Sequence, residues 1–551
     1  MDRDHTRKLT IGGRTGRITL LAISALLVVL TIPSAASATR PLTTGFEDGD
    51  QFQSADQAER AKWFDRTTDA GAGIVRLAVI WPAIAATGRP ADPTNPGSTS
   101  YDFSSVDDAV RDAEARGLKV LLSVNGAPDY AEAPGRPSSV VSYSWKPNPS
   151  DVADFMQAVA ARYSGTFDPD DAGPASQLPA AQAVEVWNEA NSSDWLTPQY
   201  EGKTAVGPEL YRAMLNASYN SVKSVNPQML VVAGGTEPYG DPPGGKRIQP
   251  VQFWQQLLCV HPVKKKGKAK KGAPPKYART NGCPGAPNFD VLSHHPIDNT
   301  GSGPLHPGPR PGDASTPDLG RIVSVLRGAE KAGTVSSGRH PVWVTEFWWD
   351  SKPPNPVGAK LQLQPRWIEQ SLYLFWKAGA AAAVNFQIAD SSTRPNVHAG
   401  YQAGVYFQDG RPKPSLAAFK FPFVTNRTTR TKLEAWGKAP ESGKLLIQRQ
   451  QGSRWLTVKK LQVSKGGVFD TSLRLSGKQS LRATVGSSKS LVWKQAAAGT
   501  RGNGGGSSLP SLPVLFAIGA AALFAAGFAR RRQVVRRRRR SGPRTAPAGT
   551  A

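Results

Sequence analysis

Two glutamates stand where predicted β-strands end, and their positions suit acid–base chemistry. Glu189 follows Asn188 at the end of the run VEVWNE, and Glu346 follows the run PVWVT. Two carboxyl groups that face one pocket can together catalyse the cleavage of a glycosidic bond. One protonates the departing oxygen, and the other attacks the anomeric carbon or activates water. Because their charges interact, their pKa values are pushed apart and each takes a different role.

The elements that must position this pair alternate between short apolar strands and amphipathic helical stretches. This alternation predicts a parallel sheet with crossover helices. Eight units over residues 39–425 are the size of a (β/α)8 barrel, in which the carboxyl ends of the strands carry the chemistry. An open doubly wound sheet would usually show a glycine-rich phosphate loop, and no segment here qualifies. The predicted strands are Thr43–Glu47, Ile74–Trp81, Lys119–Asn125, Val184–Asn188, Met229–Gly234, Phe289–His294, Pro341–Phe347 and Ala382–Ala389.

Residues 426–494 have a different pattern. Short β-branched and aromatic runs such as KLLIQRQ and RWLTVKKLQV are separated by Gly/Ser turns. This pattern predicts a small all-β sandwich of the immunoglobulin-like kind. It holds no compact set of acid, base and nucleophile, so we expect a spacer or an accessory binding module.

The two strand ends resemble those of a known group of enzymes. VEVWNEAN and VWVTEFWW resemble the strand ends of clan A retaining glycoside hydrolases, in particular of the family 39 and family 5 types. The resemblance implies that Glu189 is the general acid/base, that Glu346 is the nucleophile and that Asn188 holds the sugar 2-hydroxyl. GIVRLAVIW resembles the second strand of the clan, which places Arg76 near the nucleophile. SHHPI resembles its strand-six histidine motif, so His295 is expected to line the pocket.

Some positions depart from the family pattern. Ile297 stands where the family usually has a tyrosine that supports the nucleophile, and the eighth strand reads NFQIAD where a tryptophan is common. In place of that tryptophan, Phe386 or Gln387 would have to contact the sugar. Aromatic faces that stack on sugar rings are also expected from Trp81 and from Trp348 or Trp349, which fall at predicted strand ends or in loops. Glu185, on the strand of Glu189, is expected to pair with a buried arginine.

The net charge of +26 is unevenly distributed along the chain. Residues 426–500 carry 15 basic and 3 acidic side chains, and residues 501–551 carry 10 arginines and no acid. The barrel region is nearly neutral, so a basic groove that tracks nucleic acid is not expected there. The lysine-rich stretch KKKGKAKKGAPPK is a solvated loop or a site for an anionic envelope polymer. Cys259 and Cys283 flank it and are predicted to form a disulfide. No metal or cofactor is predicted.

Both ends of the chain carry signals for export and anchoring. Residues 1–38 have the charged, apolar and A-x-A segments of a signal peptide; an uncleaved anchor is the alternative. A Gly/Ser-rich linker over 495–511 precedes an apolar stretch at 512–529, which is just long enough to span a bilayer. The arginine-rich tail at 530–551 then places the body of the protein outside the cell.

These observations predict an exported, single-pass membrane protein whose extracellular domain cleaves β-linked oligo- or polysaccharide. A retaining mechanism predicts carboxyl groups about 5–5.5 Å apart, against about 6.5–9.5 Å for inversion. The alternative is a non-catalytic glycan-binding or adhesive surface protein with a degenerate barrel. Turnover measured beside glycan binding would separate the two.

Overall fold

A computed structural model describes residues 39–263, 275–285, 287–298, 301–394 and 400–498. The predicted signal peptide, the membrane span at 512–529, the arginine-rich tail, most of the linker and most of the lysine-rich stretch lie outside these residues. Within the described ranges, no helix is both long enough and apolar enough to cross a bilayer.

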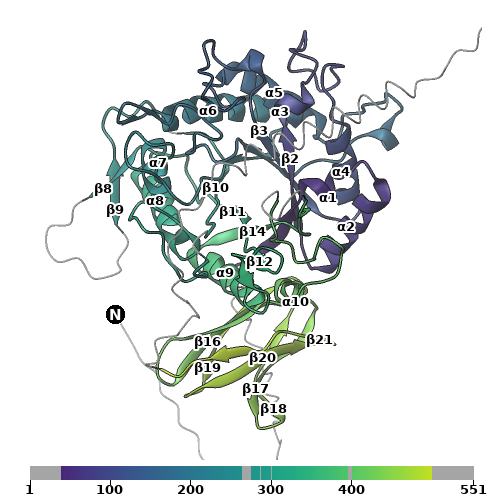
Figure 1. The fold of residues 1–551 in the computed structure, drawn as a ribbon, viewed down its shortest axis with the longest axis vertical. Helices are drawn as coiled ribbons and strands as arrows, with labels where there is room; N and C mark the ends of the chain where they lie inside the picture. The colour runs from purple at the N-terminus through teal and green to yellow at the C-terminus, as the bar shows by residue number, and fades with distance from the viewer. Residues whose placement is uncertain (1–38, 264–274, 286, 299–300, 395–399, 499–551) are drawn as a thin grey trace, which may run out of the picture. The chain divides into compact units, whose positions relative to one another are not determined.

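Eight parallel strands close into a barrel, as the sequence predicts (Figure 1). Their order around the barrel is β1-β14-β11-β10-β7-β4-β3-β2. Each predicted strand is present, and the boundaries differ by at most three residues. The strands are β1 (Thr43–Glu47), β2 (Ile74–Ile80), β3 (Lys119–Asn125), β4 (Ala183–Val186), β7 (Leu230–Ala233), β10 (Val291–His294), β11 (Val342–Phe347) and β14 (Ala380–Phe386).

Helices surround the barrel, and the longer ones lie between successive strands (Figure 1). Their apolar sides pack with the strands in one large core, which accounts for the strands being apolar on both faces. The longer helices are α2 (Gln57–Asp69), α4 (Ser104–Glu114), α5 (Pro149–Arg162), α6 (Gly207–Val225), α7 (Pro250–Leu257), α8 (Leu319–Ala332) and α9 (Gln364–Ala378). The short ones are α1 (Gly49–Phe52), α3 (Trp81–Ile84) and α10 (Pro414–Lys420).

The barrel interior is built in two layers. The lower layer is a separate apolar cluster made of Ile74, Leu121, Ala183, Val232, Val291, Trp343, Ala382 and Val384. Side chains two residues further along a strand point to the same face. In several strands that next inward position is polar, as in the change from Ile74 to Arg76 or from Ala183 to Glu185. The apolar layer therefore closes the barrel below a buried polar layer at the carboxyl ends of the strands.

The region after the barrel consists of two antiparallel sheets, which agree with a small β-sandwich. One sheet has the order β15-β16-β19, and the other has the order β18-β17-β20-β21, with β22 paired to β20. Apolar side chains from both sheets, such as Leu433 and Ile447, belong to one buried cluster. The strands are β15 (Phe423–Arg427), β16 (Lys432–Lys438), β17 (Gly443–Gln451), β18 (Arg454–Val463), β19 (Val468–Arg474), β20 (Gln479–Val485), β21 (Ser488–Lys489) and β22 (Trp493–Gln495).

The predicted disulfide is confirmed. Cys259 and Cys283 are bonded, with their Cα atoms 5.7 Å apart. The short strands β8 (Val260–Val263) and β9 (Lys276–Arg279) pair as an antiparallel ribbon between the two cysteines. The bond therefore closes the base of the segment that contains the lysine-rich stretch.

Candidate active site

Glu189 lies in a tight turn directly after β4. Both Trp187 (φ 72°) and Glu189 (φ 42°) adopt the left-handed region, which residues other than glycine rarely occupy. The Trp187 side chain is buried, and its Nε1 donates to the carbonyl of Trp195 at 2.9 Å, which helps to hold the turn. Unfavourable backbone conformations of this kind concentrate at functional sites. The turn therefore presents Asn188 and Glu189 directly after the carboxyl end of β4.

Glu346 reaches the site because β11 contains an irregularity. Trp343 and Thr345 face the barrel interior, so simple alternation would turn Glu346 outward. The pairing of β11 with β14 shifts register between Val344 and Phe347, which gives β11 one extra residue. An extra residue of this kind bends a strand and redirects a side chain. The bulge thus accounts for Glu346 facing the same site as Glu189.

His295 brings the two carboxyl groups together. Its Nδ1 lies 3.0 Å from Glu189 Oε1 and 3.7 Å from Glu346 Oε2. Glu189 Oε1 and Glu346 Oε2 are therefore at most 6.7 Å apart, the sum of 3.0 Å and 3.7 Å. This limit reaches only the lowest part of the separation of about 6.5–9.5 Å that is typical of inverting enzymes. The side chains of Glu189 and Glu346 are each 12 % exposed, so both are largely dehydrated yet accessible. The neighbouring His294 is buried and bonded to Thr236 and Ala314, away from the pair.

Arg76 is the centre of the charged layer below the pair. Its Nε donates to Glu185 at 2.7 Å, and its Nη1 contacts both Glu47 and, at 3.4 Å, Glu346. Its Nη2 donates to Asn188 Oδ1 at 2.8 Å. The prediction that Glu185 pairs with a buried arginine is confirmed. The single guanidinium of Arg76 therefore orients Asn188 and contacts three carboxyl groups. Because one positive charge faces three carboxyl groups, the cluster has an excess of negative charge when all three are ionised.

The surroundings set the protonation of each group. Burial raises the pKa of Glu189 to about 7, although the hydrogen bond from Trp195 Nε1 at 3.0 Å lowers it. Burial and the nearby Glu47 and Glu189 raise the pKa of Glu346 well above its usual range, while Arg76 opposes this rise. Burial raises the pKa of Glu185, but Arg76, His295 and the hydrogen bond from Ser293 together outweigh it, so the pKa is lowered. Glu189 is thus suited to hold a proton near neutral pH.

Hydrogen bonds fix the tautomer of His295. Burial lowers the pKa of His295 to about 3, so the ring is neutral. The Thr345 hydroxyl donates to Glu185 at 2.9 Å and must therefore accept from His295 Nε2, 3.0 Å away. Nδ1 is then the acceptor nitrogen, and it faces the Glu189 carboxyl. This arrangement favours Glu189 in its protonated form.

The predicted aromatic contacts occupy different places. Trp348 is half-buried and lies beside Phe386 and Tyr401, with ring centroids 5.6 Å and 5.3 Å away. Burial and the charges of Glu346 and Glu189 raise the pKa of Tyr401, which places this cluster near the pair. Trp81 instead stacks on Phe155 in the core, because α3 begins at that residue and turns it inward.

Trp349 also lies apart from the pair. It is buried, its Nε1 donates to Ser371 of α9, and its ring packs against Trp367. The alternation of side chains at the end of β11 turns it toward the helices. Trp348 is therefore the one of the three predicted tryptophans that the structure brings to the site.

Sequence reasoning missed three side chains of this site, Glu47, Thr345 and Tyr401, and it considered Trp195 as a sugar platform but preferred other tryptophans. Glu47 ends β1 as Glu346 ends its own strand, so the strand-end rule applied to the first strand would have found it. Thr345 sits two residues after the inward-facing Trp343 and was readable from alternation. Trp195 and Tyr401 come from loops, and no local pattern marks their direction. Within the described ranges, no cluster of three or more His, Cys, Asp or Glu is arranged to hold a metal ion.

Comparisons with known proteins give structural matches only. No protein-family model matches the sequence, and no curated protein matches it. Among solved structures, a family 39 glycoside hydrolase from the gut symbiont Bacteroides cellulosilyticus is 17 % identical, with a TM-score of 0.45. The match covers 79 % of this chain and 81 % of that one.

Two further structures are similar to the chain. A GH5_18 protein from Streptomyces cattleya, in complex with GlcNAc, is 15 % identical over 70 % of this chain and 79 % of that one, with a TM-score of 0.44. A GH30 endoxylanase from Clostridium papyrosolvens is 12 % identical over 80 % of this chain and 96 % of that one, with a TM-score of 0.43. By their descriptions, these three structures are of families 39, 5 and 30, and the sequence motifs were likened to the first two.

Proposed function

We propose that this protein is a retaining glycoside hydrolase that cleaves β-linked oligo- or polysaccharide by double displacement. The observation that carries the proposal is the pair Glu189 and Glu346, which faces one nitrogen of His295. Their close approach supports direct attack by one carboxylate, because an inverting enzyme leaves room for a water molecule between the two.

The roles follow from the local electrostatics. Glu346 Oε attacks the anomeric carbon while the glycosidic C–O bond breaks, and Glu189 gives its proton to the departing oxygen. The ionised Glu189 then takes a proton from water, whose oxygen attacks the anomeric carbon and releases Glu346. Asn188, held through its Oδ1 by Arg76, directs its amide nitrogen as a donor to the sugar 2-hydroxyl.

The charge balance around Arg76 indicates where a further proton lies. Glu47 and Glu346 share Arg76 Nη1, and burial raises the pKa of both carboxyl groups. A nucleophile must be ionised, so in the reactive state the proton of this pair lies on Glu47. Arg76 then stabilises the Glu346 carboxylate.

The cellular setting is part of the same proposal. The signal-like residues 1–38 and the apolar stretch at 512–529 support an exported barrel that a single helix anchors to the membrane. Cell fractionation followed by protease treatment of intact cells tests this. Loss of the barrel to protease in the membrane fraction is expected, and protection of the barrel would contradict an extracellular location.

A glycan-binding protein without turnover is the second candidate. Two observations favour it: Ile297 occupies the position of the expected tyrosine, and burial together with Glu47 raises the pKa of Glu346 well above its usual range. A nucleophile that stays protonated would not attack. The aromatic group of Trp348, Phe386 and Tyr401 would still offer a surface for sugar rings.

The decisive experiment measures turnover and binding on one preparation. A panel of β-linked oligosaccharides is incubated with the wild-type protein and with Glu189→Gln, Glu346→Gln and the exposed control Glu114→Gln. We expect cleavage by the wild type and the control, and losses of at least about 1000-fold in the two site variants. Binding of oligosaccharide by the wild type without any cleavage would support the second candidate instead.

A further inference from the structure

One sheet of the β-sandwich has an unusual charge pattern. Strands β17, β18, β20 and β22 contain seven Lys or Arg residues and no Asp or Glu. The acidic side chains of this region lie elsewhere: Glu434 on β16, Asp470 on β19 and Glu441 in the turn before β17. The basic side chains of the four strands make no ion pair with any described residue. The positive charge is therefore concentrated on one sheet and left uncompensated.

Register places several polar side chains on the outer face of this sheet. In β20, Leu481, Ala483 and Val485 are buried, while Arg482 and Thr484 between them are partly exposed. Cross-strand partners share a face, so Gln448 lies outward opposite Arg482, and Lys494 lies outward opposite Ser480. Gln450 and its partner Trp455 follow on the same side. We call these six residues the outer strip: Gln448, Gln450, Trp455, Ser480, Arg482 and Lys494.

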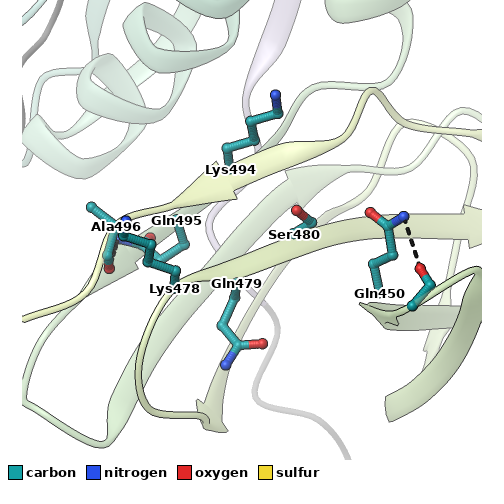
Figure 2. A pocket seen from close by; sticks show the side chains of 8 residues that line it. Gln450, Lys478, Gln479, Ser480, Lys494, Gln495 and Ala496 are labelled. Carbon is teal, nitrogen blue, oxygen red and sulfur yellow. Dashed lines mark hydrogen bonds between the residues drawn. The ribbon is translucent and has the colours of Figure 1, made fainter.

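Contacts within the outer strip organise its side chains. The Arg482 guanidinium lies 4.1 Å from the centroid of the Trp455 ring, and its Nε donates to Gln448 Oε1 at 2.9 Å. Gln450 Nε2 donates to the carbonyl of Gly452 at 3.2 Å. Figure 2 shows Gln450, Ser480 and Lys494 on one side of the sheet and Gln479 on the other. Gln450, Ser480, Lys494 and Lys478 also line an open hollow of about 480 Å³.

Protection of an edge strand explains only part of this pattern. Lysines on β18, such as Lys459 and Lys460, discourage pairing of an exposed edge with another chain. Arg482 lies on β20, which pairs with β17 on one side and with β21 and β22 on the other, so that role does not apply to it. A tryptophan beside carboxamides and cations offers a ring surface, hydrogen-bond donors and positive charge in one row.

We infer that the outer strip binds an acidic polysaccharide. The Trp455 ring offers a surface for a sugar ring, Gln448 and Gln450 reach hydroxyl groups, and Arg482 and Lys494 pair with carboxylates. Because the outer strip contains basic side chains and no acidic one, it should bind an anionic polysaccharide more tightly than a neutral one. This binding lies outside the barrel and needs no cleavage, so it goes beyond the proposed hydrolysis.

Affinity electrophoresis of the intact protein tests this, with Glu346→Gln present in every variant so that no polysaccharide is consumed. The probes are polygalacturonate and its fully methyl-esterified form, which has the same backbone without charge. We expect polygalacturonate to retard the protein, whereas its methyl-esterified form should not. The double variant Arg482→Gln with Lys494→Gln should weaken this binding at least about tenfold, as should Trp455→Ala, while Trp455→Phe retains most of it.

The matched control is Lys432→Gln with Lys465→Gln, which removes two exposed basic side chains outside the outer strip. A loss below twofold is expected for it. An equal loss in both double variants would overturn the proposal, because binding would then follow net charge alone. Equal binding of double-stranded DNA or of anionic lipid vesicles would also overturn it. Cleavage of a small glycoside by protein that retains Glu346 should be the same in the outer-strip variants, which separates this test from that of the proposed function.

Discussion

In the proposed mechanism, the proton on Glu189 sets the upper pH limit of acid catalysis. Since burial raises the pKa of Glu189 to about 7, the general acid is lost as the pH rises through that value. His295 supports the protonated form, because Thr345 and Glu185 hold its Nε2 as the donor and leave Nδ1 as an acceptor. A few contacts of Glu189 and His295 therefore determine the upper pH limit of activity, so single substitutions at these contacts should shift it.

Trp195→Phe should move that limit to higher pH. The indole Nε1 donates to Glu189 Oε2 and stabilises the ionised form, so its removal raises the pKa of Glu189. We expect the basic limb of kcat/KM against pH to shift upward by about one pH unit, which corresponds to ~1.4 kcal/mol of hydrogen-bond energy. Trp367→Phe, which changes a tryptophan away from the pair, should leave the limb in place. A shift to lower pH in Trp195→Phe would refute this assignment.

Glu47→Gln should extend activity to lower pH. The negative charge of Glu47 raises the pKa of Glu346, and glutamine resembles the protonated glutamate that the mechanism requires. The pKa of the nucleophile then falls, and the acidic limb of kcat/KM moves to lower pH. Glu114→Gln, the loss of an equal charge on the surface, should leave this limb unchanged. Complete inactivity of a folded Glu47→Gln protein would argue that Glu47 must ionise.

At the scale of elements, the end of β7 is packed against His295. A Cβ atom on Gly235 would lie 2.2 Å from His295 Nε2, so alanine there must displace the ring. We expect Gly235→Ala to lower kcat about 100-fold, the cost of a displacement of roughly 1 Å at a reacting group. Gly320→Ala, at a helix position where a Cβ meets no atom within 4 Å, is the matched control. Wild-type turnover by Gly235→Ala would contradict a role for His295.

The elements show where sequence reasoning succeeds. The barrel was predictable because strands such as Ile74–Ile80 and Lys119–Asn125 are apolar on both faces and because the strands alternate with helical segments. Glu189 and Glu346 were predictable as strand-end carboxyls. The direction of Glu346 was not, because it depends on a bulge that β11 forms only through its pairing with β14. Trp81 was predicted to contact ligand, yet it packs on Phe155. This prediction was wrong because the local sequence does not show which side of a strand end faces the helices.

At the scale of the whole molecule, the sandwich and the barrel share buried contacts. Lys438 of β16 is buried and donates to Thr44 Oγ1 of β1 and to the carbonyl of Gly71, each at 3.1 Å. Trp436 packs near Trp376 of α9, and Tyr373 donates to Glu434. The two regions are therefore expected to unfold together.

Lys438 should make part of the stability depend on pH. Burial lowers its pKa to about 8 in the folded protein, whereas an unfolded lysine has a pKa near 10.4. Between these values the unfolded chain binds more protons, so the free energy of unfolding rises with pH. Between pH 7.5 and pH 9.5 the wild type should gain about 2 kcal/mol relative to Lys438→Met. Denaturant unfolding at pH 7.5 and 9.5 measures the difference, with Lys432→Met as the exposed control. A difference that does not change with pH would contradict the argument.

The most direct test of the central claim is covalent trapping. The intact protein is incubated with a panel of activated 2-deoxy-2-fluoro glycosides, its mass is measured and the labelled peptide is mapped. The account predicts one stable adduct, carried by Glu346 and absent from Glu346→Gln, because the nucleophile forms a glycosyl intermediate that the fluorine makes slow to hydrolyse. An adduct on another residue, or turnover that yields inverted product without any adduct, would contradict it.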